Sequence, residues 1–75
     1  MIGNVSKKIG KRIKLERVKR DWTQERLAEE ADLNKNSIGS IERGDSSPSI
    51  DTLAKIAEAF GVALHDLTDV SKVEL

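Results

Sequence analysis

A series of helix start and stop signals divides this chain into short segments, and no other sequence feature constrains its fold as strongly. Thr23, Asn34 and Ser49 each precede a helix-forming segment, where a side-chain oxygen can accept a hydrogen bond from the first turn. Gly44 and Gly61 follow two of these segments, at the position where glycine closes a helix in the left-handed conformation. The pattern therefore predicts an all-α fold built from short helices.

Apolar periodicity predicts five helices between these signals. Val5, Ile9 and Ile13 recur every four residues and mark one face of a first helix over about 6–20. The next two helices are expected over 24–31 and 35–43. A fourth, over 50–60, repeats apolar residues every three or four positions from Ile50 to Phe60 and should belong to the core. A short fifth helix is expected near 62–67, and the sparse apolar tail at 70–75 has no predicted structure.

Length and composition exclude several classes of protein. The 75 residues allow one domain, and with no cysteine and one histidine the chain cannot form disulfides or a thiolate or histidine metal cage, so we expect neither metal nor cofactor. No stretch approaches the roughly 18 apolar residues of a membrane span, and the first residues lack the apolar core of a secretory signal. A cytoplasmic protein is the expectation.

The formal net charge of zero conceals an uneven distribution of charge along the chain. Residues 1–20 contain eight basic side chains and one acidic one, whereas the remaining 55 residues contain five basic and twelve acidic ones. A basic segment of this kind can face a polyanion such as the phosphates of a nucleic acid. It can equally be a solvated, lysine-rich helix, and composition alone leaves both interpretations open.

Two details of the pattern favour a functional interpretation. Arg17 continues the apolar series of the first helix, so it requires a partner, because an unpaired buried charge is costly. The segment 35–43 contains mediocre helix formers and only two large apolar residues, Ile38 and Ile41. Two short helices joined by about three residues, the second of them mostly polar, are typical of a helix-turn-helix.

The chain resembles the Cro and phage-repressor (Xre-like) family of DNA-binding domains. The resemblance covers about residues 6–69 and is carried by Trp22-Thr23-Gln24, Leu27-Ala28, Ala31-Asp32-Leu33, Ile38, Ile41-Glu42-Arg43-Gly44, Pro48-Ser49 and Phe60-Gly61-Val62. It implies a compact five-helix, lambda-repressor-like domain over 1–75, with its core at 6–69, a C-terminal tail at 70–75 and the helix-turn-helix at helices two and three. One departure is Asp32, which stands where the family usually has glycine.

The resemblance also implies roles for individual residues. Base contacts are expected from the third helix, at Lys35, Asn36, Ser40 and, to a base edge or a phosphate, Ser37. The residues expected near phosphates are Gln24, Thr23 (chiefly a helix cap), Arg43, Arg17 and Arg12, the last with Lys11 or Lys14 as alternatives. Arg17 is expected to form a salt bridge with Glu42, which would supply the partner that its position in the apolar series requires.

The function implied is that of a sequence-specific transcriptional regulator that binds double-stranded DNA. We expect a homodimer on a palindromic operator, similar to phage repressors or the controller proteins of restriction-modification systems. Leu64, Leu67, Val70 and Val73 are the dimer candidates, although Leu64 and Leu67 could instead belong to the core. The alternative is an antitoxin or adaptor-type protein-interaction module of the same fold. Enzymatic activity is not expected, because His65 and Asp66 are the only candidate dyad and are more typical of surface residues.

Overall fold

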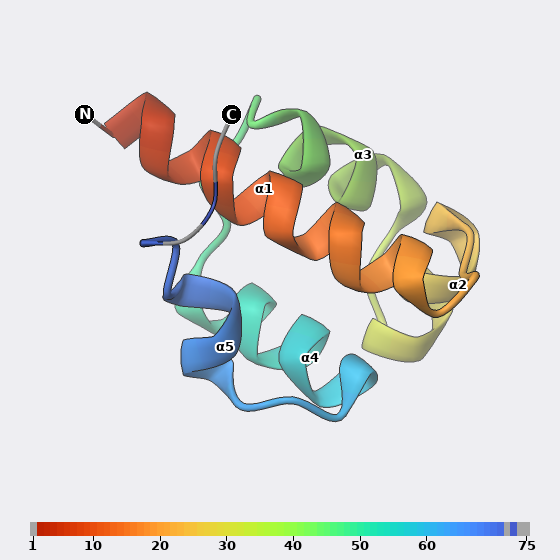
Figure 1. Ribbon diagram of the computed structural model, residues 1–75. Helices are drawn as coiled ribbons and strands as arrows, with labels where there is room; N and C mark the ends of the chain where they lie inside the picture. Colours follow the sequence, from red (N-terminus) through yellow and green to blue (C-terminus); the bar gives the residue numbers. More distant parts are fainter. Residues whose placement is uncertain (1, 72, 74–75) are drawn as a thin grey trace.

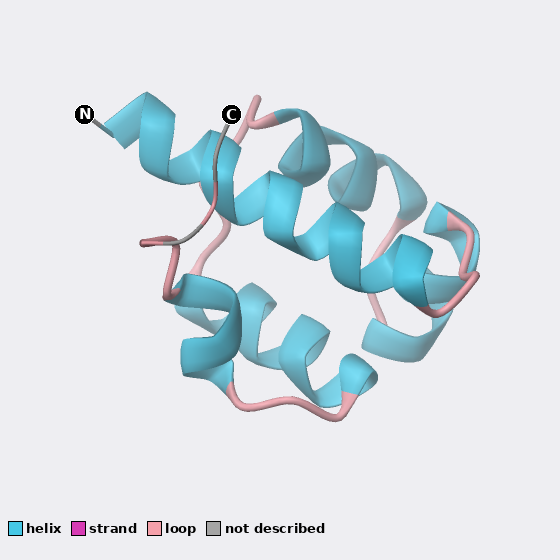
Figure 2. Ribbon diagram, viewed as in Figure 1, coloured by secondary structure: helices cyan, strands magenta, loops and turns pink. Residues whose placement is uncertain are grey.

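Five α-helices make up the regular structure of residues 2–71 and 73, which the computed structural model describes (Figure 1). They are α1 (Ile2–Lys19), α2 (Gln24–Ala31), α3 (Lys35–Arg43), α4 (Ile50–Phe60) and α5 (Leu64–Thr68). Figure 2 shows these helices joined by loops, with no strand in the part of the chain described, so the predicted all-α fold is confirmed. Residues 72, 74 and 75 of the predicted tail lie outside the described residues.

The predicted capping residues set the bounds of the three middle helices. The side chains of Thr23, Asn34 and Ser49 each accept a hydrogen bond from the backbone N–H three residues later, at 3.0–3.1 Å. Gly44 and Gly61 end α3 and α4 with φ angles of 76° and 73°, in the left-handed region that glycine adopts at little cost. Each cap supplies partners for backbone groups that the helix itself leaves unpaired.

The turns that have no glycine use aspartate instead. Asp32 ends α2 in the left-handed conformation, with φ 54° and ψ 49°, and the N–H of the next residue, Leu33, donates to the carbonyl of Ala28 at 2.8 Å. Asp21, which follows the end of α1, has φ 57°. Aspartate tolerates this conformation better than most residues do, so the departure from the family pattern at Asp32 leaves the turn geometry intact.

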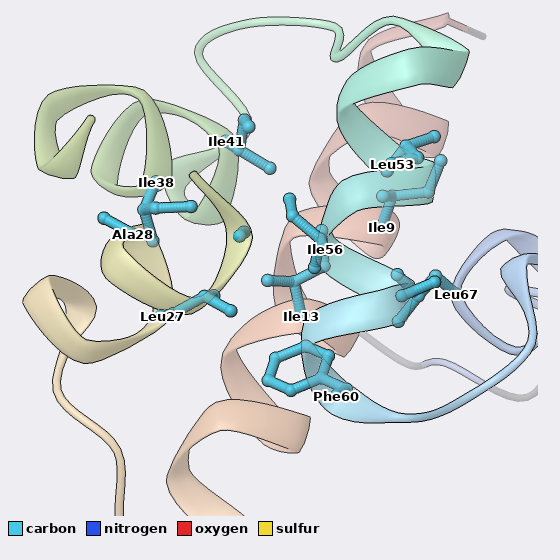
Figure 3. Packing of buried hydrophobic residues seen from close by; sticks show 12 residues of the cluster. Ile9, Ile13, Leu27, Ala28, Ile38, Ile41, Leu53, Ile56, Phe60 and Leu67 are labelled. Atoms are coloured by element: carbon cyan, nitrogen blue, oxygen red, sulfur yellow. The ribbon is translucent and has the colours of Figure 1, made fainter. Parts of the chain in front are cut away.

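One aliphatic core lies between α1, the α2–α3 pair and the α4–α5 pair (Figure 3). Its buried side chains are Ile9, Ile13, Leu27, Ala28, Ala31, Ile38, Ile41, Leu53, Ile56, Ala57, Phe60 and Leu67. Trp22 packs against this cluster and stacks on Phe60, with ring centroids 5.7 Å apart. Both apolar stripes predicted from the sequence therefore reach the core over most of their length.

The two stripes extend less far into the core than the sequence predicts. Val5 at one end of the α1 stripe is 47% exposed, and Ile50 at the start of the α4 stripe is 66% exposed. Both residues lie near the N-terminal ends of their helices and line an open groove that Pro48 and Thr68 border. Helix α1 also begins at Ile2, four residues before the predicted start.

Close contact and side-chain bonds hold α1 against its neighbours. Gly10 packs directly on the backbone carbonyls of Ile41 and Glu42 in α3, where a Cβ atom would have no room. Directly after the end of α1, Arg20 donates to the carbonyl of Phe60 at 3.0 Å, and its guanidinium lies 4.6 Å from the centroid of the Phe60 ring. These contacts fix α1 across both α3 and α4. None of the helices described is long and apolar enough to cross a membrane.

Candidate nucleic-acid interface

Helix α3 directs its apolar side chains inward and most of its polar ones outward. Ile38 and Ile41 are buried in the core, whereas Lys35, Asn36 and Ser37 are exposed and Ser40 is partly exposed. At 100° per residue, Asn36, Ser40 and Arg43 form one stripe along the outer face of the helix, with Lys35 and Ser37 on either side of it. The structure therefore brings the predicted base-contacting residues together on one accessible face.

Three of these outer side chains are paired within the chain. The Nζ atom of Lys35 lies 3.1 Å from Glu25 Oε1, and Arg43 Nε lies 2.8 Å from Asp45 Oδ2. Ser40 Oγ donates to Ser46 Oγ at 3.2 Å. All three pairs are at the surface, where water competes for the same groups and an ion pair contributes only about 0–1 kcal/mol. A phosphate or a base edge can therefore displace them at little cost.

A side-chain hydrogen bond joins the start of α2 to Glu42 in α3. Gln24 is half-buried, and its Nε2 donates to Glu42 Oε1 at 3.1 Å. Thr23 is exposed, and its hydroxyl oxygen accepts the capping hydrogen bond. The positive end of a helix dipole at this position favours an anion. The geometry thus fits the prediction that Thr23 is chiefly a cap. The hydrogen bond to Glu42 holds the Gln24 amide in place.

Arg17 has the partner that its place in the apolar series required. Its Nε and Nη2 donate to the two carboxylate oxygens of Glu42, at 2.7 and 3.0 Å, and its Nη1 donates to the carbonyl of Trp22 at 2.7 Å. The Arg17 side chain is 12% exposed and that of Glu42 is 3% exposed. The pair links α1, the loop before α2, and α3. With three donors occupied and little surface exposed, Arg17 holds the fold together and offers little to a phosphate.

The lysines of α1 that border α3 lie on one side of that helix. Lys7 packs against Gly44, at the end of α3. Lys11 and Lys14 line a shallow hollow together with Glu42 of α3. Lys7 therefore lies at the C-terminal end of α3, and Lys11 and Lys14 lie near Glu42 on the side of α3 that faces α1.

Arg12 lies on a different stripe of α1, and the prediction of a phosphate contact gains no support there. Its Nε bonds to Glu16 Oε2 at 3.2 Å, and Glu16 in turn bonds to Arg20 Nη1 at 2.9 Å. Because Arg20 reaches Phe60, this stripe faces α4 rather than α3. The pKa of Glu16 is lowered, chiefly by its hydrogen bond with Arg20. Burial partly opposes this shift, and the positive charges of Lys19, Arg12 and Arg20 add to it.

Arg20 has a structural role, since it joins Glu16 to the end of α4, whereas the sequence indicates only that it belongs to the basic segment. Its partner Glu16 lies four positions earlier, a spacing at which side chains meet on a helix, so one half of the arrangement carries a sequence signal. The other half, the bond to the Phe60 carbonyl, depends on how α4 ends and carries none.

The predicted dimer residues are mostly used inside the chain. Leu67 is fully buried in the core, and Val73 is only 9% exposed, so neither has surface to offer to a second copy. Leu64 and Val70 are partly buried and pack against the same core. Leu67 therefore belongs to the core, which is the alternative expected for it, and the dimer contacts predicted at Leu67 and Val73 gain no support.

His65 and Asp66 lie close together at the surface and are not enclosed as a catalytic dyad would be. The His65 side chain is 82% exposed, and its Nε2 lies 3.5 Å from Asp66 Oδ1. The other oxygen of Asp66 accepts a hydrogen bond from the backbone N–H of Ala63 at 3.1 Å. Asp66 therefore caps the start of α5, which gives it a structural role.

Comparison with known proteins agrees with this geometry. Residues 13–67 match the family described as helix-turn-helix. The chain is 36% identical to control protein C.BamHI of Bacillus amyloliquefaciens, over 97% of this chain and 91% of that protein. It is 43% identical to the immunity repressor protein of Bacillus phage phi105 over 72% of this chain, but this match spans only 38% of the phage protein.

A solved structure extends the similarity to three dimensions. The restriction-modification controller protein C.AhdI from Aeromonas hydrophila superposes with a TM-score of 0.81 at 29% identity, covering 83% of this chain and 94% of that one. Residues 13–67, which match the helix-turn-helix family, include α2, the turn and α3 in full, and therefore most of the surface described above.

Proposed function

Because the chain belongs to the helix-turn-helix family of DNA-binding transcriptional regulators, we propose that it recognises a specific operator through the outer face of α3. The observation that carries this proposal is the division of α3 itself. Ile38 and Ile41 hold the helix on the core, while polar side chains occupy its whole outer face. A helix of this kind fits the major groove of duplex DNA.

The side chains on that face have the chemistry to distinguish base pairs. Asn36 can donate to N7 and accept from N6 of an adenine in the bidentate arrangement, through its amide nitrogen and oxygen respectively. Lys35, once it exchanges Glu25 for DNA, can donate to O6 and N7 of a guanine. Ser40 can bond to either type of base, and Ser37 to a base edge or a phosphate. Each good contact discriminates by about 1–3 kcal/mol.

Phosphate contacts on both sides of α3 would position it in the groove. Gln24 at the start of α2 and Arg43 at the end of α3 bracket the base-contacting residues. Lys14 and Lys7 on the α3 side of α1 extend the same surface and take the place of Arg12 in this proposal. Such contacts set orientation and overall affinity, whereas the base contacts set sequence preference.

The operator we propose is a palindrome bound by a homodimer. One module of this size buries only about 600–1,000 Å² on DNA, so high specificity requires two copies on half-sites about 10 base pairs apart. The similarity to C.BamHI and C.AhdI favours a regulator of the controller type, and the similarity to the phage protein favours a repressor. Either acts where the DNA is, in the cytoplasm, and neither requires catalysis or a cofactor.

Selection from a random duplex DNA library tests this proposal. We expect the native chain to enrich an inverted repeat, and the triple variant Lys35→Ala, Asn36→Ala, Ser40→Ala to enrich none. Circular dichroism should show that this variant stays folded, because none of the three side chains is buried. Lys55→Ala on α4 is the matched control and should select the native sequence.

Two results would contradict the proposal. If the native chain enriches no sequence, the alternative of a protein-interaction module of the same fold gains the support that DNA recognition loses. If the triple variant selects the native operator, α3 does not contact the bases.

A further inference from the structure

Helix α3 has a gap in the row of side chains that borders α2. Residues four apart lie next to each other on a helix, so Lys35, Gly39 and Arg43 form this row, with the glycine in the middle. Glycine inside a helix lowers its stability relative to alanine. The gap therefore needs a reason, and the proposed recognition helix is where a reason connected with DNA binding is expected.

Two side chains from different helices fill the space above Gly39. The point at which a Cβ atom of residue 39 would lie is 3.1 Å from Arg43 Nη1 and 3.6 Å from Gln24 Oε1. Arg43 reaches this point from the next turn of α3, because long side chains on a helix lean towards its N-terminus. Gln24 reaches it from the first turn of α2. Gly39 is buried, and these two side chains are its nearest cover.

The guanidinium of Arg43 is the group whose place depends on the missing Cβ atom. A separation of 3.1 Å is closer than an ordinary van der Waals contact, so a methyl group on residue 39 would push Nη1 away. Asp45 holds the same guanidinium at its Nε atom, 2.8 Å from Asp45 Oδ2. The Arg43 side chain is nevertheless 64% exposed. Its guanidinium thus lies over the glycine with surface available to a ligand.

Gln24, by contrast, is fixed by a bond to a buried residue. Its Nε2 donates to Glu42 Oε1 at 3.1 Å, and Glu42 is in turn paired with Arg17. An amide nitrogen carries two hydrogens, so one donor is used in this bond and the second remains for an anion. Because the amide is held in place, the distance between the two side chains is set by where Arg43 lies.

We propose that Gly39 is a positioning residue for DNA binding, because its missing side chain lets the Arg43 guanidinium lie beside the Gln24 amide. The two side chains then form one phosphate-binding site with the glycine beneath it. Gln24 precedes the base-contacting residues in the chain and Arg43 follows them, yet the fold brings their ends to the same point. The inference rests on the proposed function and adds to it a residue that acts only through Arg43.

The chemistry of this site fits a phosphate of the DNA backbone. A guanidinium and an amide N–H group are both donors, and the oxygens of a phosphate diester are all acceptors. Contacts with phosphates fix the position of a protein on the duplex without reading its sequence. Gly39 should therefore influence the affinity for all DNA sequences alike, unlike Asn36 on the neighbouring stripe.

Alanine at residue 39 separates the two effects of the glycine. In the free protein the Arg43 side chain can turn away from a methyl group, so the fold keeps its packing and gains helix propensity. In the complex with DNA the displaced guanidinium no longer lies beside Gln24. Gly39→Ala should therefore stabilise the chain while it weakens DNA binding, a combination that a purely structural role would not produce.

The test is a double-mutant cycle on operator affinity, measured by fluorescence anisotropy with the native chain, Gly39→Ala, Arg43→Ala and the double variant. We expect each single substitution to weaken binding about tenfold, the effect of losing one hydrogen bond to a charged group. Because the alanine acts by displacing Arg43, the double variant should bind within about twofold of Arg43→Ala alone. Affinity for a random duplex should fall by the same factors, since a phosphate contact carries no sequence information.

The other outcomes are distinct from one another. Native affinity in Gly39→Ala would overturn the inference and leave DNA recognition intact. An equally large loss in the Arg43→Ala background would overturn it as well, by showing that the methyl group obstructs the DNA itself. A Gly39→Ala chain that unfolds at lower urea concentration than the native chain would mean that the fold, rather than Arg43, needs this space. Absence of any selected operator for the native chain would instead contradict the proposed function.

Discussion

Glu42 is the residue on which the polar contacts between three parts of the fold converge. Its two carboxylate oxygens accept hydrogen bonds from Arg17 and Gln24 while its side chain is almost fully buried. Such a carboxylate compensates a buried guanidinium, and removing one partner leaves the other charge without compensation. Glu42 should therefore contribute more to the stability of the fold than a residue in a surface ion pair does.

We expect Glu42→Gln to reduce the free energy of unfolding by about 3–5 kcal/mol, because it leaves Arg17 buried without a counter-charge. Urea unfolding at neutral pH measures the difference. Glu30→Gln is the matched control, since it removes the exposed ion pair with Arg26 and should cost less than about 1 kcal/mol. Equal, small losses from both substitutions would show that the buried pair contributes nothing special.

Glu16 makes the stability depend on pH in the acidic range. Its pKa is lowered from 4.5, first by the hydrogen bond with Arg20, so the folded state binds the proton more weakly than the unfolded chain. The stabilisation is thus fully present above about pH 4.5 and is lost as the pH falls through the folded-state pKa. We expect Glu16→Gln to be less stable than the native chain at pH 7, with the difference shrinking towards pH 3.

Thermal unfolding of both proteins across this range is the measurement. All other residues are the same in the two proteins, so the difference between the two curves isolates the effect of Glu16. A difference that stays constant with pH would mean that the carboxylate charge has no role in stability.

Individual residues differ in how far their roles follow from sequence. The partner of Arg17 is required by its place in the apolar series, and resemblance to a known family indicates Glu42. The pairing of Lys35 with Glu25 and of Arg20 with the Phe60 carbonyl carries no such signal, because each depends on where two helices meet in space. A buried charge can be predicted to have a partner, because its burial without one is costly. Pairs that form only because two helices meet cannot be predicted in this way.

At the scale of the helices, two glycines within helices have opposite consequences for packing. Gly10 lets α1 approach the carbonyls of Ile41 and Glu42 in α3, so its missing Cβ is what makes the contact possible. Gly39 in α3 has as its nearest neighbour the Nη1 atom of Arg43, 3.1 Å from the position of a Cβ, and this flexible side chain can move away. One glycine is thus required by the packing, and the other weakens its helix.

We expect Gly10→Ala to destabilise the fold by about 1–3 kcal/mol, because α1 and α3 must separate to admit a methyl group. Gly39→Ala should stabilise it by up to about 1 kcal/mol, the difference in helix propensity. Urea unfolding of the two variants measures both effects. Two changes of the same sign would contradict this account of the contact between α1 and α3.

The helices themselves were predictable where the chain carries explicit signals. The caps at Thr23, Asn34 and Ser49 set the starts of α2, α3 and α4 where the sequence places them. The start of α1 at Ile2 is not predicted, because the residue before it, Met1, is not of a helix-capping type such as Thr23, Asn34 or Ser49. Periodicity also identifies which side of a helix faces inward, but it does not predict that Val5 and Ile50 on that side are exposed.

At the scale of the whole molecule, the division of charge matters more than its sum. The first 20 residues carry a large positive excess and the remaining 55 an equal negative one. The lysines of α1 on the α3 side add to the proposed DNA-binding surface, while acidic residues gather elsewhere, as around Lys55 on α4, where Glu30, Asp32 and Glu58 lie. A molecule with no net charge can therefore still be attracted to DNA through one of its sides.

We expect DNA affinity to fall steeply with salt, because each neutralised phosphate releases counterions. Lys14→Gln should reduce the slope of log K against log salt concentration by up to about 0.9. Lys55→Gln, which makes the same change within the acidic surroundings of α4, should leave the slope unchanged. Fluorescence anisotropy with the selected operator at several salt concentrations provides the measurement. Equal effects of both substitutions would mean that total charge, rather than its position, controls binding.

The capping of α3 at both ends has a consequence for the thermodynamics of recognition. Asn34 and Gly44 close the helix with bonds made inside the chain, and Ile38 and Ile41 anchor it. The helix proposed to enter the major groove is therefore already ordered in the free protein, and we expect no folding transition of α3 on binding. The heat capacity change on association should then match the surface buried between two rigid bodies, without the large negative excess that marks a segment folding as it binds.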